Sequence, residues 1–345
     1  MHIIMKLSIA LLLASSTGWA TALERQCHGN ARNEGGNWFC GEIEHMLYTG
    51  MRSRGSYKTV TGMGSNGQCS MQDKSYDGPL GPLDDELSIH IRGPFHLKEA
   101  AVYNLGAGNN WNRVAYYNAE RRQADNMVFM GNYGGQGSGV FDYKWGNSLS
   151  YLNADGTAGT GSPQVLKDVQ VPSGKEFSIF SGQRCDGSCG FSRANDVAYK
   201  GFGGGNKVFL FHFKMPLDGN RGFNGDMPAL WALNARIPRA AQYNACNCWQ
   251  TGCGEFDIFE VLAKGDRKCK STFHMASGFG SSDYFARPVD GFVKIAVVLS
   301  AKTSAVSIHR LDYNTGFESS FSDATVFGWL MGPMNGKGAS KFEAS

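Results

Sequence analysis

Three carboxylates lie within six residues of one another in the stretch Glu255-Phe-Asp-Ile-Phe-Glu260. If this stretch is an extended strand, Glu255 and Asp257 share one face, while Phe256 and Ile258 point into the core. Strict alternation would send Glu260 to the opposite face. A one-residue bulge near Phe259 would correct this, because it sets two residues opposite one. We therefore expect all three acids on one surface of the strand.

A pair of carboxyl groups on one surface is what a retaining glycosidase needs. Such enzymes place two carboxyl groups about 5–5.5 Å apart across the scissile bond. One attacks the anomeric carbon, and the other protonates the leaving oxygen and later activates water. A third carboxyl group at Asp257 would raise the pKa of a neighbour by like-charge repulsion and could share a proton with it.

Two other interpretations of the three acids stay open at this point. Alternating acids are common on the solvated face of a strand. Three carboxylates can also ligate calcium. The absence of an interleaved lysine argues against a merely solvated face, because crowded like charges cost stability unless they have a role.

The composition indicates the kind of fold that must position these side chains. The chain has 46 glycines, 12% aromatic residues and only 18% charged residues. Long helical periodicity is missing, and short aromatic and β-branched stretches alternate with turn residues. This is typical of an all-β protein, and we predict a concanavalin-like β-jelly-roll sandwich. Helices are predicted only at Tyr117–Asp125 and Pro238–Tyr243.

The N-terminus has the pattern of a signal peptide over residues 1–22. Basic residues up to Lys6 precede the apolar run Leu7–Leu13, and Ala20-Thr-Ala22 resembles a cleavage site. The apolar run is too short to span a bilayer, so this prediction is favoured over a membrane anchor. The protein is therefore expected to be secreted, to an extracellular or cell-wall location.

The rest of the chain divides into two predicted parts. Residues 23–108 form a glycine-rich, cysteine-containing N-terminal segment, in which Glu86–Arg92 alternates as a half-buried strand does. The stretch Gly106–Asn110 is a plausible joint. Residues 109–345 form the predicted jelly-roll catalytic domain.

The cysteines and the net charge limit the kinds of ligand that this chain is expected to bind. Nine cysteines in a secreted chain are expected to form disulfides, with one left over, and their spacing argues against zinc. Loss of Lys6 with the signal peptide lowers the formal net charge from +3 to +2. This is too little to favour nucleic acid or an anionic membrane, and it suits a neutral substrate. No cofactor and no metal are predicted, and the oligomeric state stays open.

The acidic stretch resembles the E-x-D-x-x-E signature of the laminarinase-type glycoside hydrolases, family sixteen. Met227–Asn234 and Phe211–Pro216 are similar to strands that precede the signature in that family. The resemblance implies Glu255 as the nucleophile, Asp257 as its helper and Glu260 as the acid/base.

A second resemblance covers nearly the whole mature chain. The chain is similar to the Tos-type fungal cell-wall proteins, regarded as endo-1,3-β-glucanases, in several glycine-rich and aromatic stretches: Gly36–Cys40, Gly55–Tyr57, Val60–Met63, Leu87–Pro94, Asn147–Tyr151 and Cys246–Leu262. Members of that group often carry a Ser/Thr-rich stretch between their two parts, which this chain lacks. The resemblance implies a secreted endo-1,3-β-glucanase of the cell wall that acts on β-glucan by double displacement. A non-catalytic glucan-binding wall protein and a β-glucan transglycosylase are the alternatives.

Three further residues are predicted to bind substrate. Trp231 and Trp249 could each present a ring face to the C–H groups of a sugar. For Trp231 a place in the core is equally compatible with its apolar strand. His274, on a strand expected beside the acidic one, resembles a histidine that family-sixteen enzymes bond to their carboxylates. A structural role is an equal alternative for His274.

Overall fold

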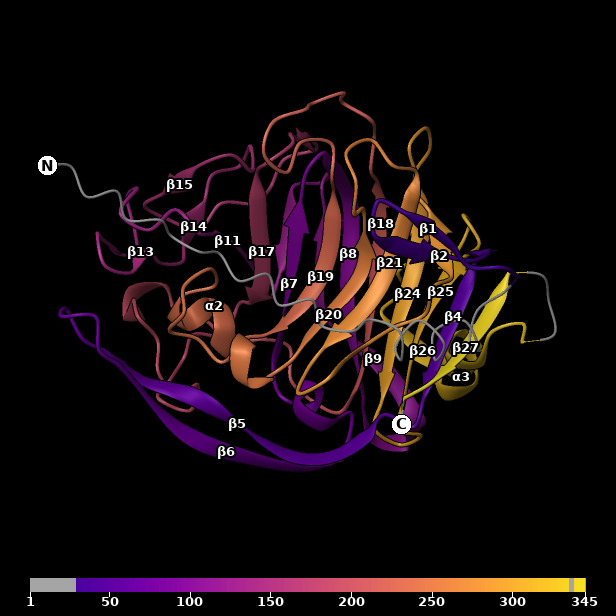
Figure 1. The fold of residues 1–345 in the computed structure, drawn as a ribbon, viewed down its shortest axis with the longest axis horizontal. Helices are drawn as coiled ribbons and strands as arrows, with labels where there is room; N and C mark the ends of the chain where they lie inside the picture. The colour runs from indigo at the N-terminus through magenta and orange to yellow at the C-terminus, as the bar shows by residue number, and fades with distance from the viewer. Residues whose placement is uncertain (1–28, 335–337, 345) are drawn as a thin grey trace, which may run out of the picture.

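The computed structural model describes residues 29–334 and 338–344, so the signal peptide predicted at 1–22 lies outside the described residues. Most strands of the described chain belong to two large β-sheets that pack face to face (Figure 1). The predicted all-β sandwich is confirmed. None of the helices in the described ranges is long and apolar enough to cross a membrane.

The first sheet has ten strands, and β18 lies in its middle between β8 and β24. Along the sheet the order is β10 (Gln123–Asp125), β9 (Asn110–Asn118), β8 (Phe95–Leu105), β18 (Asn206–Lys214), β24 (Val293–Ser300), β25 (Ala305–Leu311), β4 (His45–Thr49) and β27 (Ala339–Glu343), with β16 (Gln170–Val171) paired to β8 and β26 (Ser320–Ser322) to β9.

The second sheet has eleven strands and contains the acidic stretch. Its order is β15 (Gly159–Thr160), β14 (Ser150–Leu152), β11 (Met127–Gly131), β17 (Glu176–Ser181), β7 (Leu87–Arg92), β19 (Ala229–Asn234), β20 (Glu255–Glu260), β21 (Lys268–His274), β23 (Tyr284–Ala286) and β3 (Glu42–Ile43), with β22 (Gly278–Phe279) paired to β21.

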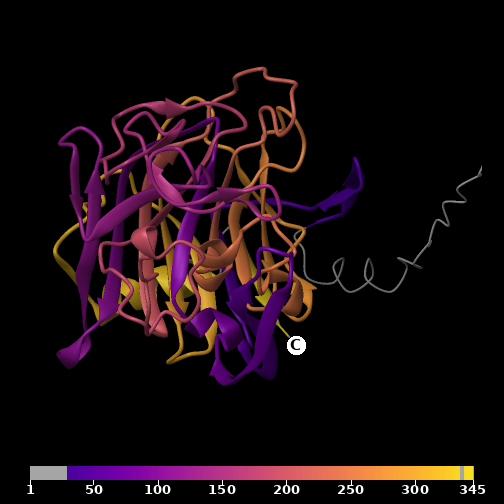
Figure 2. The ribbon, with the colours of Figure 1, turned by 90° about the vertical axis from the view of Figure 1, so that its left-hand side faces the viewer.

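Three hairpins and a few short helices complete the described fold. The hairpins pair β1 (Arg32–Glu34) with β2 (Asn37–Phe39), β5 (Arg52–Met63) with β6 (Cys69–Pro79), and β12 (Phe141–Asp142) with β13 (Gly146–Asn147). The helices are α2 (Arg236–Ala240), α3 (Asp323–Met331) and the 3₁₀ turns η1 (Gly81–Asp84), η2 (Ala107–Asn109), η3 (Asn195–Val197) and η4 (Trp249–Thr251). The indigo hairpin β1–β2 projects from the body of the molecule (Figure 2).

The main core lies between the two sheets and follows from side-chain alternation. In β7, Ile89 and Ile91 point inward to this core, while His90 and Arg92 belong to the opposite face. Phe256 stacks on Phe273 of the neighbouring strand at 4.1 Å between ring centroids. A smaller core on the outer side of the ten-stranded sheet is covered by α3. The outer face of the eleven-stranded sheet carries polar side chains, among them His90 and Arg92 of β7.

Strands from both sides of residue 108 share the two large sheets. Strands β4, β7 and β8 precede that residue and lie inside the sheets. Strands β8 and β9 are neighbours, and Gly106–Asn110 is the turn between them. The parts predicted at 23–108 and 109–345 thus complete one sandwich together, and the boundary itself stays a prediction.

The helix prediction for Tyr117–Asp125 is wrong. This segment consists of the end of β9, a turn and the strand β10. Ala124 of β10 pairs with Tyr117 of β9. Arg122 has φ 49°, so the turn reverses the chain at that residue. The predicted helix at Pro238–Tyr243 is partly right, since α2 ends at Ala240.

Disulfides form as expected for a secreted chain. The pairs are Cys69–Cys246, Cys185–Cys189 and Cys248–Cys253, and Cys40 is also disulfide-bonded. The thiol of Cys269 is free and buried. The cysteines around residue 250 are therefore engaged in disulfides, which contradicts the zinc alternative for them.

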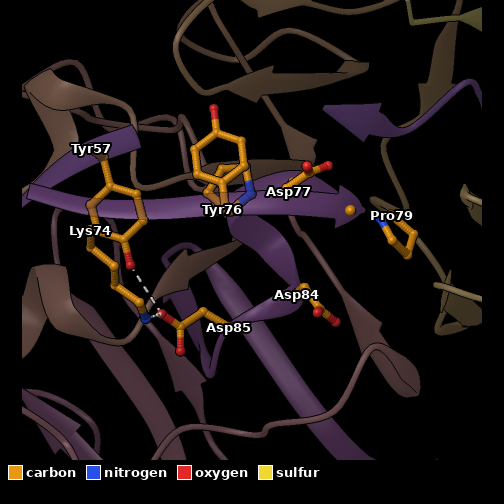
Figure 3. Close-up of a pocket in the computed structure, with 10 residues that line it drawn as sticks. Tyr57, Lys74, Tyr76, Asp77, Pro79, Asp84 and Asp85 are labelled. Carbon is orange, nitrogen blue, oxygen red and sulfur yellow. Dashed lines mark hydrogen bonds and ion pairs between the residues drawn. The ribbon is translucent and has the colours of Figure 1, made fainter. Parts of the chain in front are cut away.

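The long hairpin β5–β6 runs along one edge of the sandwich (Figure 1). A pocket of about 330 Å³ lies between this hairpin and η1, and Tyr57 and Lys74 point from the hairpin toward Asp85 (Figure 3). Tyr57 Oη donates to Asp85 at 3.0 Å, and Lys74 and Arg236 form ion pairs with the same carboxylate. These cations overcome the effect of burial and hold the pKa of Asp85 well below its usual range. The contacts with Asp85 hold the hairpin against the sandwich. None of the three acids lines this pocket.

Candidate active site

A bulge in β20 brings the three acids to one face of the sheet. Against β19, Asp257 pairs with Trp231 and Phe259 pairs with Leu230, so Ile258 is the extra residue. Against β21, Asp257 pairs with Thr272 and Glu260 with Lys270. The bulge expected near Phe259 is confirmed, and Phe256, Ile258 and Phe259 all point into the main core.

The strand register sorts the outer face into rows that cross the sheet. One row contains Ser88, Leu233, Glu255 and His274; the next contains His90, Trp231, Asp257 and Thr272; the third contains Glu176, Arg92, Ala229, Glu260 and Lys270. Directly opposite residues of neighbouring strands lie on the same face. Each acid thus stands in its own row, with a different set of neighbours.

The three acids line one cleft of about 370 Å³. Arg92, Trp231 and Trp249 line the same cleft. Its roof is the loop between α2 and β20, which returns to the sheet through Gly252-Cys253-Gly254. Gly252 has φ 90°, and a Cβ there would lie 2.7 Å from the backbone nitrogen of Ala276, so only glycine fits.

Glu255 is held by a tryptophan. The indole N–H of Trp249 donates to the Glu255 carboxylate. Burial raises the pKa of Glu255, and the hydrogen bond from Trp249 opposes this rise because it favours the charged form. The ring of Trp249 is 44% exposed, so it also presents surface to a ligand.

Asp257 is the most buried of the three acids, at 5% exposure. Burial raises the pKa of Asp257 from 3.8 to about 7. His274 Nε2 lies 3.0 Å from Asp257 Oδ2 and opposes this rise. In return, the hydrogen bond to Asp257 raises the pKa of His274. Asp257 can therefore hold a proton in the pH range in which ordinary carboxyl groups are ionised.

Glu260 contacts a cation that sequence reasoning did not assign to the site. Arg92 Nη2 lies 3.4 Å from Glu260 Oε1, and Arg92 Nη1 lies 3.8 Å from Glu176 Oε1. Arg92 Nε donates to the carbonyl of Met227 at 2.7 Å, which fixes the guanidinium between the two glutamates. The alternation of Ser88, His90 and Arg92 on one face of the predicted strand could have indicated this arginine.

The predicted substrate-binding residues lie around the acids and differ in how much of each is exposed. Trp231 lines the cleft floor but is only 5% exposed, because its ring stacks on His90 and packs under the loop that follows α2. Trp249 stands at the opening. His274 contacts Asp257, and its ring lies 6.1 Å from that of Trp249. Sequence reasoning missed Glu176 and Tyr243, whose hydroxyl donates to Glu176, and no local sequence signal marks either of them.

The sequence is similar to those of known fungal cell wall proteins. Two family models match the chain: the one for the C-terminal part of cell wall protein YJL171C/Tos1 over residues 109–329, and the one for its N-terminal part over residues 44–105. A Candida albicans protein named "Probable circularly permuted 1,3-beta-glucanase TOS1" is 32% identical, with 94% of this chain and 98% of that protein aligned.

Two further relatives carry similar names. An Arthroderma benhamiae protein named "Probable circularly permuted 1,3-beta-glucanase" is 34% identical over 87% of this chain and 90% of its own length. A similarly named Schizosaccharomyces pombe protein is 44% identical over 64% of this chain and 46% of its own length. No solved structure matches the chain.

Proposed function

Because the chain belongs to the Tos1/YJL171C family of cell wall proteins, we propose that it is a secreted endo-1,3-β-glucanase that hydrolyses wall β-glucan with retention of configuration. The observation that carries this proposal is the bulge in β20, which puts Glu255, Asp257 and Glu260 into one cleft. The names of the relatives support the substrate class.

In the proposed reaction Glu255 is the nucleophile. Its carboxylate attacks the anomeric carbon, and the bond from that carbon to the leaving oxygen breaks as Glu260 donates its proton to this oxygen. A covalent glycosyl–enzyme forms. Glu260 then removes a proton from water, which attacks the same carbon and releases Glu255 as a carboxylate.

The neighbours of Glu255 and Asp257 support the roles proposed for these two acids. The Trp249 N–H favours the ionised form of Glu255, as a nucleophile requires. Asp257 lies between the two glutamates along the strand and holds a proton more tightly than an ordinary aspartate, because it is buried. We propose that the hydrogen bond between His274 and Asp257 keeps the Asp257 carboxyl group oriented beside the nucleophile.

The tryptophans are proposed to contact the sugar from two sides. Trp249 is exposed at the opening of the cleft, where its ring face can pack against sugar C–H groups. Trp231 forms part of the floor and is only 5% exposed.

The test is release of reducing sugar from laminarin, a β-1,3-glucan. We expect the unchanged protein to release it, and Glu255→Gln and Glu260→Gln each to lower the rate by at least about 1000-fold. Glu120→Gln, a matched change at an exposed glutamate outside the cleft, should leave the rate unchanged. Binding of laminarin without cleavage by the unchanged protein would support the non-catalytic alternative. Products longer than the substrate would support a transglycosylase.

A further inference from the structure

A residue that lines the cleft forms a hydrogen bond with a strand that is distant in sequence. Tyr243, in the loop after α2, donates its hydroxyl to the carboxylate of Glu176 on β17. Gln242 Nε2 in turn donates to the Tyr243 hydroxyl at 3.0 Å. We call the pair Tyr243–Glu176 the latch.

The register shows how far the latch reaches across the sheet. Glu176 pairs with Arg92, Arg92 with Ala229, and Ala229 with Glu260. Adjacent strands are roughly 4.8 Å apart, so Glu176 stands about 14 Å from the strand of the proposed acid/base. The loop of Tyr243 leaves from β19 through α2 and returns at β20. The hydrogen bond to Glu176 therefore brings this loop to β17, two strands away from β19.

The latch shares a cation with the proposed acid/base Glu260. Arg92 lies between Glu176 and Glu260, at 3.8 Å and 3.4 Å from their carboxylate oxygens. Burial raises the pKa of Glu176, and the Tyr243 hydroxyl and the Arg92 guanidinium oppose this rise. The latch is thus anchored on the side chain that also contacts the proposed acid/base.

With the latch closed, the cleft is small for a polymer. Its volume of about 370 Å³ is near the lower end of the range of roughly 300–1,000 Å³ for small-molecule sites. A polysaccharide bound in the cleft must extend beyond it at both ends, and Tyr243 lines the cleft while its hydroxyl contacts Glu176 of β17.

The latch is also built so that it can open. Tyr243 is 65% exposed as a residue, so its ring is not packed into the core and can move without opening the fold. The second half of the loop is fixed by the disulfides Cys69–Cys246 and Cys248–Cys253. Movement is therefore confined to the residues between Ala241 and Cys246.

We propose that Tyr243 determines how many sugar units bind on the β17 side of Glu260, and that a long glucan chain binds only after the latch opens. This proposal rests on the proposed glucanase function. The ligand class is a linear β-1,3-linked glucan of more units than the closed cleft can hold.

The test measures binding in the Glu255→Gln background, where no ligand is cleaved. Laminaribiose and laminarihexaose are titrated by calorimetry with and without Tyr243→Phe, which removes only the hydroxyl. We expect the ratio of hexaose to biose affinity to increase several-fold in the phenylalanine variant. Glu176→Gln, which weakens the latch from its other side, should change the ratio in the same direction. Tyr313→Phe is the matched control, because Tyr313 is 64% exposed and lies outside the cleft lining.

The outcomes separate the two proposals. Binding of both ligands with an unchanged affinity ratio in Tyr243→Phe and Glu176→Gln would overturn the latch and leave the glucan site standing. Failure of both ligands to bind any variant would contradict the glucanase proposal, and the latch proposal with it. Hydrogen exchange at residues 241–245 gives a second readout, and the latch predicts faster exchange in Tyr243→Phe than in its parent.

Discussion

Replacing Asp257 by asparagine should stabilise the protein at alkaline pH while it impairs the proposed activity. Most substitutions of buried residues destabilise a fold. Asp257 is 5% exposed, and burial raises its pKa from 3.8 to about 7. The folded state therefore binds the proton of Asp257 more tightly than the unfolded state does. The free energy of unfolding therefore falls as the pH rises above 3.8, the pKa of Asp257 in the unfolded state. It stops falling above about pH 7, the pKa in the folded state.

The magnitude follows from the two pKa values. The interval from 3.8 to about 7, at about 1.4 kcal/mol per pKa unit, corresponds to about 4 kcal/mol. An asparagine side chain at this position would keep the shape and an oxygen that can accept from His274, without the buried charge. We expect Asp257→Asn to raise the free energy of unfolding by about 2–4 kcal/mol at about pH 9. Near pH 4, where the carboxyl group is protonated in the folded state, the gain should fall below about 1 kcal/mol.

The hydrogen bond between His274 and Asp257 also makes stability fall as the pH rises, and this sets the choice of pH. This hydrogen bond raises the pKa of His274 above 6.5. This contributes stability that is present below pH 6.5 and is lost as the pH rises through the raised value. A comparison at about pH 9 therefore isolates the carboxylate of Asp257.

The assay is chemical unfolding of both proteins at about pH 4 and pH 9. The matched control is Asp226→Asn, another buried aspartate, which forms an ion pair with Arg287 at 2.6 Å. That change leaves a buried guanidinium unpaired and should destabilise by about 3–5 kcal/mol. If Asp257→Asn is less stable than the parent at pH 9, or equally stabilised at both pH values, the reasoning about the buried carboxylate is refuted.

Three further expectations follow from the same contacts. Trp249→Phe removes the N–H that favours ionised Glu255, so the pKa of Glu255 should rise further. The acidic limb of the profile of kcat/KM against pH should then move to higher pH. An unmoved limb would contradict the role of this hydrogen bond. Cys269 is buried, and burial raises the pKa of its thiol, so iodoacetamide should label Cys269 only after unfolding, as mass spectrometry can show. Across residues 29–334 and 338–344, no group of three His, Cys, Asp or Glu side chains is placed to hold a metal ion. EDTA should therefore leave the unfolding temperature unchanged, and a marked drop would favour the calcium interpretation.

The common face of the three acids could be predicted because it depends only on residues within the stretch 255–260. Two-residue alternation places Glu255 and Asp257 together, and the phenylalanines between the acids demand burial. Only one local device, the bulge, returns Glu260 to that face. Turn-separated apolar runs were likewise enough to predict the sandwich.

The parts that sequence reasoning missed depend on long-range contacts. The segment Tyr117–Asp125, predicted as a short helix, is instead a hairpin that continues the sheet, because Tyr117 pairs with Ala100 of β8 as well as with Ala124. Glu176 and Arg92 come from strands that are far apart in the sequence and meet only because β17 and β7 are neighbours. Tyr243 reaches Glu176 across two strands, which no pattern of spacing encodes.

The measurement that tests the central claim most directly locates the covalent intermediate. The protein is treated with a 2-deoxy-2-fluoro laminaribioside that has a good leaving group, digested, and mapped by mass spectrometry. The account predicts a glycosyl ester on Glu255, absent from Glu255→Gln. An ester on Asp257 or Glu260, or turnover of laminarin by Glu255→Gln at the parent rate, would contradict it.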